Sequence, residues 1–144
     1  MSYAVVQDMI DRFGADELIG LTDRAIPPTG NYDSDIIEQS IVDAEAEVNA
    51  YLASRYALPL AEVPTILTRL TCDIVRYLLY GVNLTPEITG RYDKAIAFLK
   101  NVSRGSAVLG INQTSGEAPV QENAPEHFAD DRIFSKDLLS EYSD

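Results

Sequence analysis

The sequence is poor in the residues that most often build catalytic or metal centres. Its 144 residues include one cysteine (Cys72), one histidine (His127) and no tryptophan. A lone cysteine forms no internal disulfide, so the fold does not depend on an oxidising compartment. A single histidine without a second histidine or a nearby cysteine cannot assemble a zinc site. We therefore expect no disulfide, no bound metal and no cofactor.

Positive charge and long apolar runs are scarce as well. The 11 Lys and Arg residues face 23 Asp and Glu residues, which gives a formal net charge of −12. This is the wrong sign for neutralising phosphates, so direct, sequence-specific nucleic-acid binding is not expected. No run of about 18 apolar residues is present, and the first residues lack the basic start of a signal peptide. The composition favours a soluble protein without a membrane partner.

Helical periodicity, in contrast, is abundant. Apolar residues recur at intervals of three and four, which predicts helices over 5–13, 64–80 and 86–104, a long one that begins at residues 33–35 and runs to about 56, and a short one from about residue 16. Gly81 is placed to end a helix, while Thr85 and Pro86 have the order of an N-cap and a first-turn proline. Asp35 and Glu38 have the spacing of a capping box. The predicted fold is all-α, a small bundle of about four to five helices with an extended, partly flexible C-terminal tail.

Residues 106–144 differ in composition from this predicted helical domain, residues 1–105. They carry eight acidic residues against Arg132 and Lys136, which is half of the net charge. Residues 112–130 are rich in polar residues and proline, so we expect a flexible linker. Residues 132–139 then concentrate four large apolar side chains, and such an island is expected to dock on a partner. The predicted docking residues are Ile133, Phe134, Lys136, Asp137, Leu138 and Leu139.

Few residues are candidates for catalysis or metal binding. Cys72 lies among apolar neighbours on a predicted helix, which is typical of a small core residue and not of a reactive thiol. Asp43 and Glu47 are four residues apart and would share a helix face, so a small metal-dependent enzyme is one alternative, although a solvated face is the commoner result. An acidic regulatory or DNA-mimic protein that binds a basic partner is another. No catalytic residue is predicted, and we do not expect an enzyme.

Two segments resemble a known family. Ala50-Tyr51-Leu52-Ala53-Ser54 leads into Arg55-Tyr56-Ala57-Leu58-Pro59-Leu60, and Tyr92-Asp93-Lys94-Ala95-Ile96-Ala97-Phe98-Leu99 is followed by Gly105. Together they resemble a family of virion proteins of Mu-like phages and prophages, which are similar to head-tail connector (adaptor) proteins. The motif residues that carry this resemblance are Arg55, Tyr56, Leu58, Pro59 and Leu60.

The resemblance implies a structural role and no catalytic residues. It implies a subunit that forms a homo-oligomeric ring beneath the phage portal during virion assembly. Its partners would be further copies of itself, the portal, and the tail or neck proteins. Its expected location is the cytoplasm of the bacterial host during assembly and then the neck of the mature virion.

Overall fold

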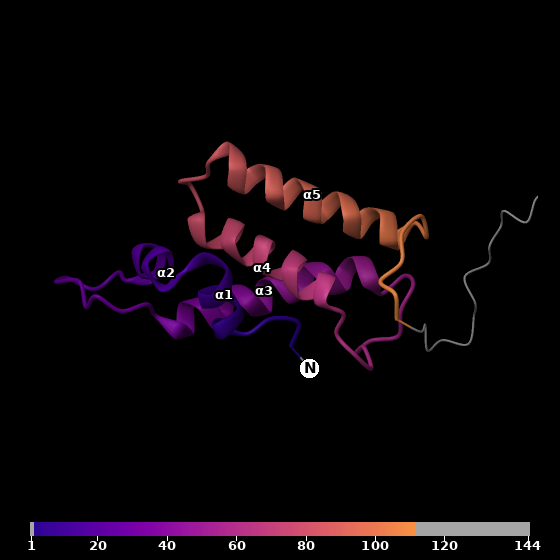
Figure 1. Cartoon of the computed structure of the whole chain (residues 1–144), viewed down its shortest axis with the longest axis horizontal. Coiled ribbons are helices and arrows are strands. Elements are labelled where there is room, and N and C mark those ends of the chain that lie inside the picture. The colour runs from indigo at the N-terminus through magenta and orange to yellow at the C-terminus, as the bar shows by residue number, and fades with distance from the viewer. Residues whose placement is uncertain (1, 112–144) are drawn as a thin grey trace, which may run out of the picture.

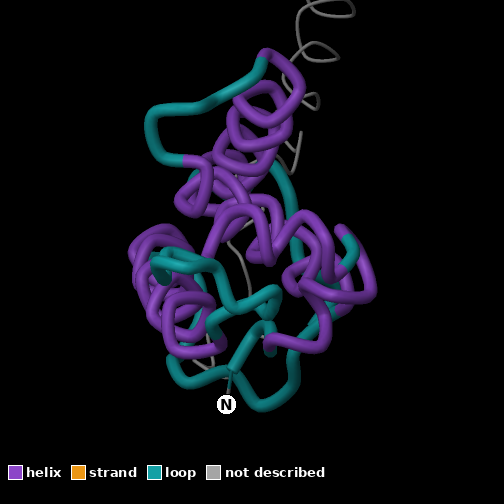
Figure 2. Tube along the Cα trace, turned by 90° about the vertical axis from the view of Figure 1, so that its left-hand side faces the viewer, coloured by secondary structure: helices purple, strands orange, loops and turns teal. Residues whose placement is uncertain are grey.

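The computed structural model describes residues 2–111, which form five α-helices (Figure 1). The helices are α1 (Val6–Phe13), α2 (Ala15–Thr22), α3 (Ser34–Leu52), α4 (Thr65–Tyr80) and α5 (Pro86–Ser103). Within residues 2–111 there is no strand, and the tube in Figure 2 alternates between helix and loop. The predicted all-α fold is therefore confirmed. No helix of this described part is long and apolar enough to cross a membrane.

Several helix ends follow the local signals in the sequence. α4 ends at Gly81, whose φ of 55° lies in the left-handed region that glycine tolerates best. α5 begins after Thr85, whose hydroxyl accepts a hydrogen bond from the Ile88 N–H at 3.3 Å. Pro86 occupies the first turn, where its missing N–H costs no hydrogen bond. These local signals define both ends of the α4–α5 turn.

α3 begins within residues 33–35 as predicted, but its predicted capping residue and its predicted C-terminal end are wrong. Asp33, not Asp35, is the N-cap, and its Oδ1 accepts hydrogen bonds from the Asp35 and Ile36 N–H groups at 3.0 and 3.3 Å. The helix ends at Leu52 and not near Tyr56, because residues 53–55 turn the chain. The Tyr56 N–H still bonds to the Leu52 carbonyl at 2.9 Å, so the turn is tight.

The three long helices α3, α4 and α5 pack against one another, and α4 lies between the other two in Figure 1. Because α4 is apolar around more than half of its circumference, it is the most deeply buried helix. Its buried residues are Leu67, Leu70, Thr71, Cys72, Ile74, Val75 and Leu79. α4 is therefore the central helix of the bundle.

The short helices α1 and α2 are held on α4 by a partly buried ion pair. Arg76 on α4 donates to Glu17 on α2 through Nε at 3.1 Å and Nη2 at 2.7 Å. The same guanidinium lies 4.5 Å from the centre of the Phe13 ring at the end of α1. Tyr80 also donates a hydrogen bond to Glu17. Burial lowers the pKa of Arg76, but the hydrogen bond and charge of Glu17 outweigh it, so the pKa is raised.

Candidate assembly surfaces

The Arg55-Tyr56 motif fixes the path of the chain after α5. The Arg55 Nε donates to the Ser103 carbonyl at 3.2 Å, close to the C-terminal end of α5. The Tyr56 hydroxyl accepts a hydrogen bond from the Leu109 N–H at 3.1 Å. The side chains of Tyr56 and Leu109 are both buried. Residues 106–111 are thereby bound to the corner between α3 and α4. We call this set of contacts the exit clamp, because it holds the last described residues, 106–111, on the bundle.

The remaining motif residues support the same corner. Leu60 is buried in the core, whereas Leu58 keeps 37% of its surface exposed. The peptide bond between Leu58 and Pro59 is cis. The motif predicted from the sequence is therefore a structural element at one end of the bundle.

Gly105 belongs to the exit clamp, and its replacement by alanine tests the clamp. Its φ of 82° is unfavourable for alanine, and an added Cβ would lie 2.7 Å from Arg55 Nη2. The Gly105→Ala variant is expected to be about 1–2 kcal/mol less stable in chemical denaturation because of the backbone conformation alone. Arg55 must also move, so we expect additional loss of its bond to Ser103. The control is Gly110→Ala, which has a similar φ of 78° but no atom within 4 Å of the added Cβ. Equal losses in the two variants would exclude a role for the Arg55 contact.

A tyrosine stack joins the three long helices. The rings of Tyr77 on α4 and Tyr92 on α5 are stacked with centres 3.9 Å apart. The Tyr92 hydroxyl donates to Glu47 on α3 at 2.7 Å. Burial, followed by this bond and the negative charge of Glu47, raises the pKa of Tyr92. The stacked rings therefore join α4 to α5, and the Tyr92 hydroxyl connects them to α3.

The Glu47 carboxylate accepts a hydrogen bond from Tyr92, which is relevant to the alternative that Asp43 and Glu47 bind a metal ion. Asp43 lies on the exposed side of α3, where it accepts a hydrogen bond from Gln39 at 3.2 Å. Within residues 2–111, no three His, Cys, Asp or Glu side chains converge as metal ligands do. The described part of the chain therefore offers no support for a site built on Asp43 and Glu47.

Cys72 is fully buried in α4, as predicted. Burial raises the pKa of its thiol to about 12, so the group is protonated at neutral pH and is a poor nucleophile. His127 and the predicted docking residues Ile133, Phe134, Lys136, Asp137, Leu138 and Leu139 lie outside the described residues.

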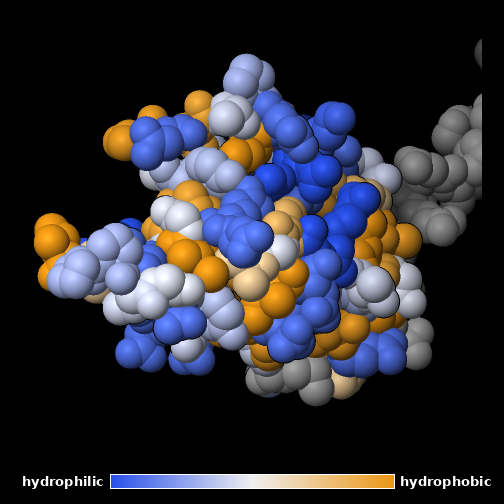
Figure 3. Space-filling view, turned by 60° about the vertical axis from the view of Figure 1, so that its left-hand side comes forward, coloured by the Kyte–Doolittle hydropathy of each residue, from blue (hydrophilic) through white to orange (hydrophobic). Residues whose placement is uncertain are grey.

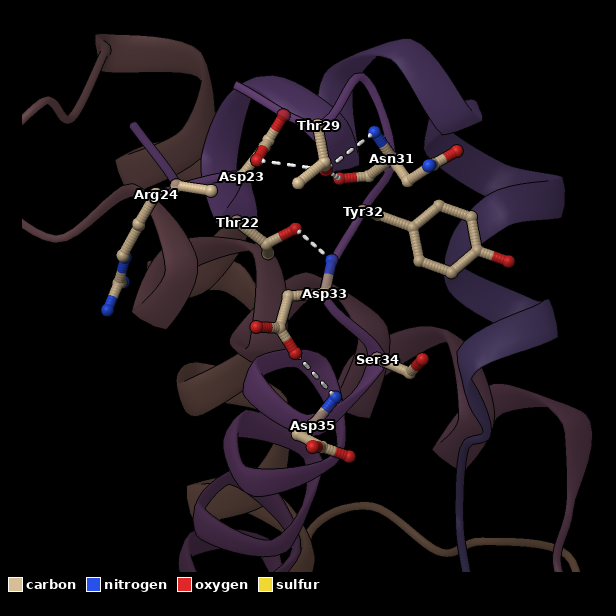
Figure 4. Close-up of a pocket in the computed structure, with 10 residues that line it drawn as sticks. Thr22, Asp23, Arg24, Thr29, Asn31, Tyr32, Asp33, Ser34 and Asp35 are labelled. Atoms are coloured by element: carbon tan, nitrogen blue, oxygen red, sulfur yellow. Dashed lines mark hydrogen bonds between the residues drawn. The ribbon is translucent and has the colours of Figure 1, made fainter. Parts of the chain in front are cut away.

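A polar pocket of about 330 Å³ lies where α2 leads into α3 (Figure 4). The Asp23 carboxylate accepts bonds from the Gly30 N–H at 2.8 Å and the Thr29 hydroxyl at 3.1 Å. The bond from Gly30 lowers the pKa of Asp23. The buried Thr22 hydroxyl accepts the Asp33 N–H at 2.8 Å. These side chains bond to their own loop, and the hydrogen bonds fix the shape of residues 23–33.

This loop and the α4–α5 turn present aliphatic side chains to solvent. Ile26 is 98% exposed and Val82 is 97% exposed, with Leu84 partly exposed beside it. Both connections project from the left-hand end of the molecule in Figure 1, and Figure 3 shows two projections with hydrophobic tips there. We call Ile26, Val82 and Leu84 the loop-end patch. Sequence reasoning missed it, because both residues lie in loops, where no periodic pattern indicates exposure.

A second apolar surface lies between the N-terminal segment and the middle of α3. It is a hollow of about 290 Å³ whose apolar lining is formed by Ala4, Val5, Val6, Ile41 and Val42. Ser2, Glu38 and Glu45 complete the lining. Val5 and Val42 are more than half exposed, which is unusual for two neighbouring aliphatic side chains. We call this surface the α3 hollow.

Comparison with known proteins places the chain in a phage family. A family model described as "Bacteriophage Mu, Gp36" matches residues 3–126. Gene product J of Escherichia phage Mu is 32% identical over 136 residues, which cover 94% of this chain and 96% of that protein. The Mu-like prophage FluMu protein gp36 of Haemophilus influenzae is 33% identical over 87 residues, or 60% of this chain and 62% of that protein. The chain therefore belongs to the bacteriophage Mu Gp36 family.

Proposed function

We propose that this protein is a structural virion protein of the phage neck, a head-tail connector subunit that forms a ring beneath the portal. The observation that carries the proposal is the loop-end patch, because two nearly fully exposed aliphatic side chains stand on two loops at one end of the bundle. Membership of the Mu Gp36 family supports it by giving the chain a phage context. The partners are other copies of the chain and the adjoining portal and tail proteins.

The two ends of the bundle have different chemistry, which suits a ring. A closed ring is built from a heterologous contact, in which two different surfaces of each subunit meet. The loop-end patch lies at one end, and the exit clamp lies at the other end, where residues 106–111 leave α5 (Figure 1). One subunit therefore has an apolar contact surface at one end. At the other end, residues 106–111, which precede residues 112–144 in the chain, are held on the bundle.

The loop-end patch is rigidly presented, which lowers the entropy lost on assembly. The Asp23 and Thr22 hydrogen bonds hold the loop that bears Ile26. Gly81 and the Thr85 cap hold the turn that bears Val82 and Leu84.

The test is to replace the two aliphatic tips by aspartate in the phage or prophage that carries the gene. An Asp side chain buried without a partner in a contact costs several kcal/mol. The Ile26→Asp/Val82→Asp double variant is therefore expected to reduce the yield of infectious particles by at least about tenfold. Electron microscopy should show filled heads and complete tails that are not joined.

The matched control is Ala25→Asp/Asn83→Asp, which adds the same charge to neighbouring exposed positions of the same two loops. It is expected to give nearly normal yields. Equal yields from both double variants would remove the loop-end patch from assembly. Joined, infectious particles from a phage with the gene deleted would refute the connector function itself.

A further inference from the structure

We propose that the α3 hollow is the docking site for residues 132–139 of the same chain in the free subunit. The proposal goes beyond the neck function and does not depend on it, because it concerns the isolated chain. It assigns the predicted docking segment to one surface of the bundle.

The first argument is the chemistry of the hollow. Val5 and Val42 expose 52% and 58% of their surface around Ile41, so an apolar side chain seated there would remove aliphatic surface from water. Residues 132–139 carry Ile133 and Phe134, followed by Leu138 and Leu139. Apolar side chains of this size are what a hollow of about 290 Å³ accepts.

The second argument is charge complementarity. Glu38 and Glu45 lie seven residues apart on α3, about 10 Å along the helix axis, on either side of Ile41 and Val42. Oε1 of Glu45 already accepts hydrogen bonds from the Tyr3 N–H at 2.6 Å and from the Ser2 hydroxyl, so Glu38 is the more available of the two carboxylates. Arg132 and Lys136 are the only Lys or Arg residues of the tail; they flank Ile133 and Phe134, and Asp131 and Asp137 are their outer neighbours. Basic groups on either side of the apolar pair therefore match acidic groups on either side of the hollow.

The third argument is reach. The exit clamp holds Leu109 against Tyr56, just beyond the C-terminal end of α3. The α3 hollow begins at Glu38, which lies about 21 Å along the helix from the end of α3 at Leu52. Residues 112–131 can span at most about 70 Å. A tether of this length also gives the segment a high local concentration, which favours its own hollow over that of another copy.

The test uses disulfide trapping in the full-length chain. The Val42→Cys/Phe134→Cys variant, oxidised at low protein concentration, is expected to form an intramolecular disulfide at least about tenfold faster than a control pair. The control is Ala97→Cys/Phe134→Cys, because Ala97 is also exposed on a helix but lies on α5. Cys72 is retained, since its buried thiol reacts slowly. Circular dichroism confirms that each variant is folded.

Charge reversal then tests the pairing. Glu38→Lys in the Val42→Cys/Phe134→Cys background is expected to slow trapping, and adding Lys136→Glu is expected to restore it. Equal trapping rates at positions 42 and 97 would overturn the proposal. So would disulfide-linked dimers in place of the intramolecular product, because the occupant would then be a second copy. Both results would leave the neck function untouched, since they are obtained without portal or tail.

Discussion

Replacing Tyr56 by alanine is expected to lower the free energy of unfolding by about 3–5 kcal/mol, the usual range for removing a large buried aromatic side chain. Tyr56 is only 5% exposed and packs within the main core. Its hydroxyl also accepts the buried Leu109 N–H, so the variant loses packing and a hydrogen bond together. Urea denaturation followed by circular dichroism measures the loss. Because 3–5 kcal/mol is a large part of the stability of a small domain, the variant is also expected to be partly unfolded at 37 °C.

The Tyr56→Phe variant separates the two contributions. It keeps the ring but leaves the Leu109 N–H without its partner, which costs about 1–3 kcal/mol in a buried setting. Tyr32→Phe serves as the control, because Tyr32 lies at the opposite end of α3 and is only partly buried. If Tyr56→Phe is as stable as the unaltered protein, the exit clamp does not depend on this hydrogen bond.

The second large effect is a loss of stability at alkaline pH that depends on Cys72. Burial raises the pKa of this thiol from 9.0 to about 12 in the folded protein. The unfolded chain releases the proton near pH 9, whereas the folded chain retains it up to about pH 12. The folded state therefore keeps its full stability with respect to this thiol below pH 9. That stability is lost as the pH rises from 9 to 12, because only the unfolded chain is stabilised by releasing the proton. The expected slope is about 1.4 kcal/mol for each pH unit within that window.

The measurement is the free energy of unfolding between pH 8 and pH 10, before tyrosine ionisation dominates. Cys72→Ala removes the titrating group, so its stability curve should be nearly flat over this range, although its stability at pH 8 is lower because a buried side chain is shortened. Parallel curves for Cys72→Ala and the unaltered protein would contradict the assignment. A supporting readout is alkylation with iodoacetamide, which should modify Cys72 only in denaturant.

The sequence predicts the helices well because their signals are local. The apolar width of α4, the stop at Gly81 and the Thr85 cap with Pro86 each act within one or two turns of helix. A local pattern is enough to place such features, and the structure confirms them.

The boundaries of α3 could not be predicted in this way, since contacts from distant residues decide them. Asp33, Ser34 and Asp35 are all suitable N-caps by residue type. The Thr22 hydroxyl accepts the Asp33 N–H, and this contact with the end of α2 is not visible in the local sequence pattern. At the other end, Tyr56 continues the apolar stripe of α3, but it packs under Leu109 instead.

The candidate surfaces were less predictable than the fold. The Arg55-Tyr56 motif was identified by its resemblance to a family. Its role in holding residues 106–111 became clear only from its contacts with Ser103 and Leu109. Ile26 and Val82 lie in loops, where exposure follows no periodicity, so no pattern in the sequence marks them. The α3 hollow combines residues from two segments about 40 positions apart, and only the packed structure brings them together.

The exit clamp also determines how mechanical force would enter the bundle. Tension applied to residues 112–144 acts first on residues 106–111, which are bound to Tyr56 beside the α3–α4 corner. The pull therefore reaches the interior of the bundle and does not unwind α5 turn by turn from its C-terminal end. Arg55 also donates a hydrogen bond to the Ser103 carbonyl. The Arg55 and Tyr56 hydrogen bonds must therefore break together before a helix separates from the bundle. A subunit tethered in this way resists a steady pull on its C-terminal segment by shear and not by peeling.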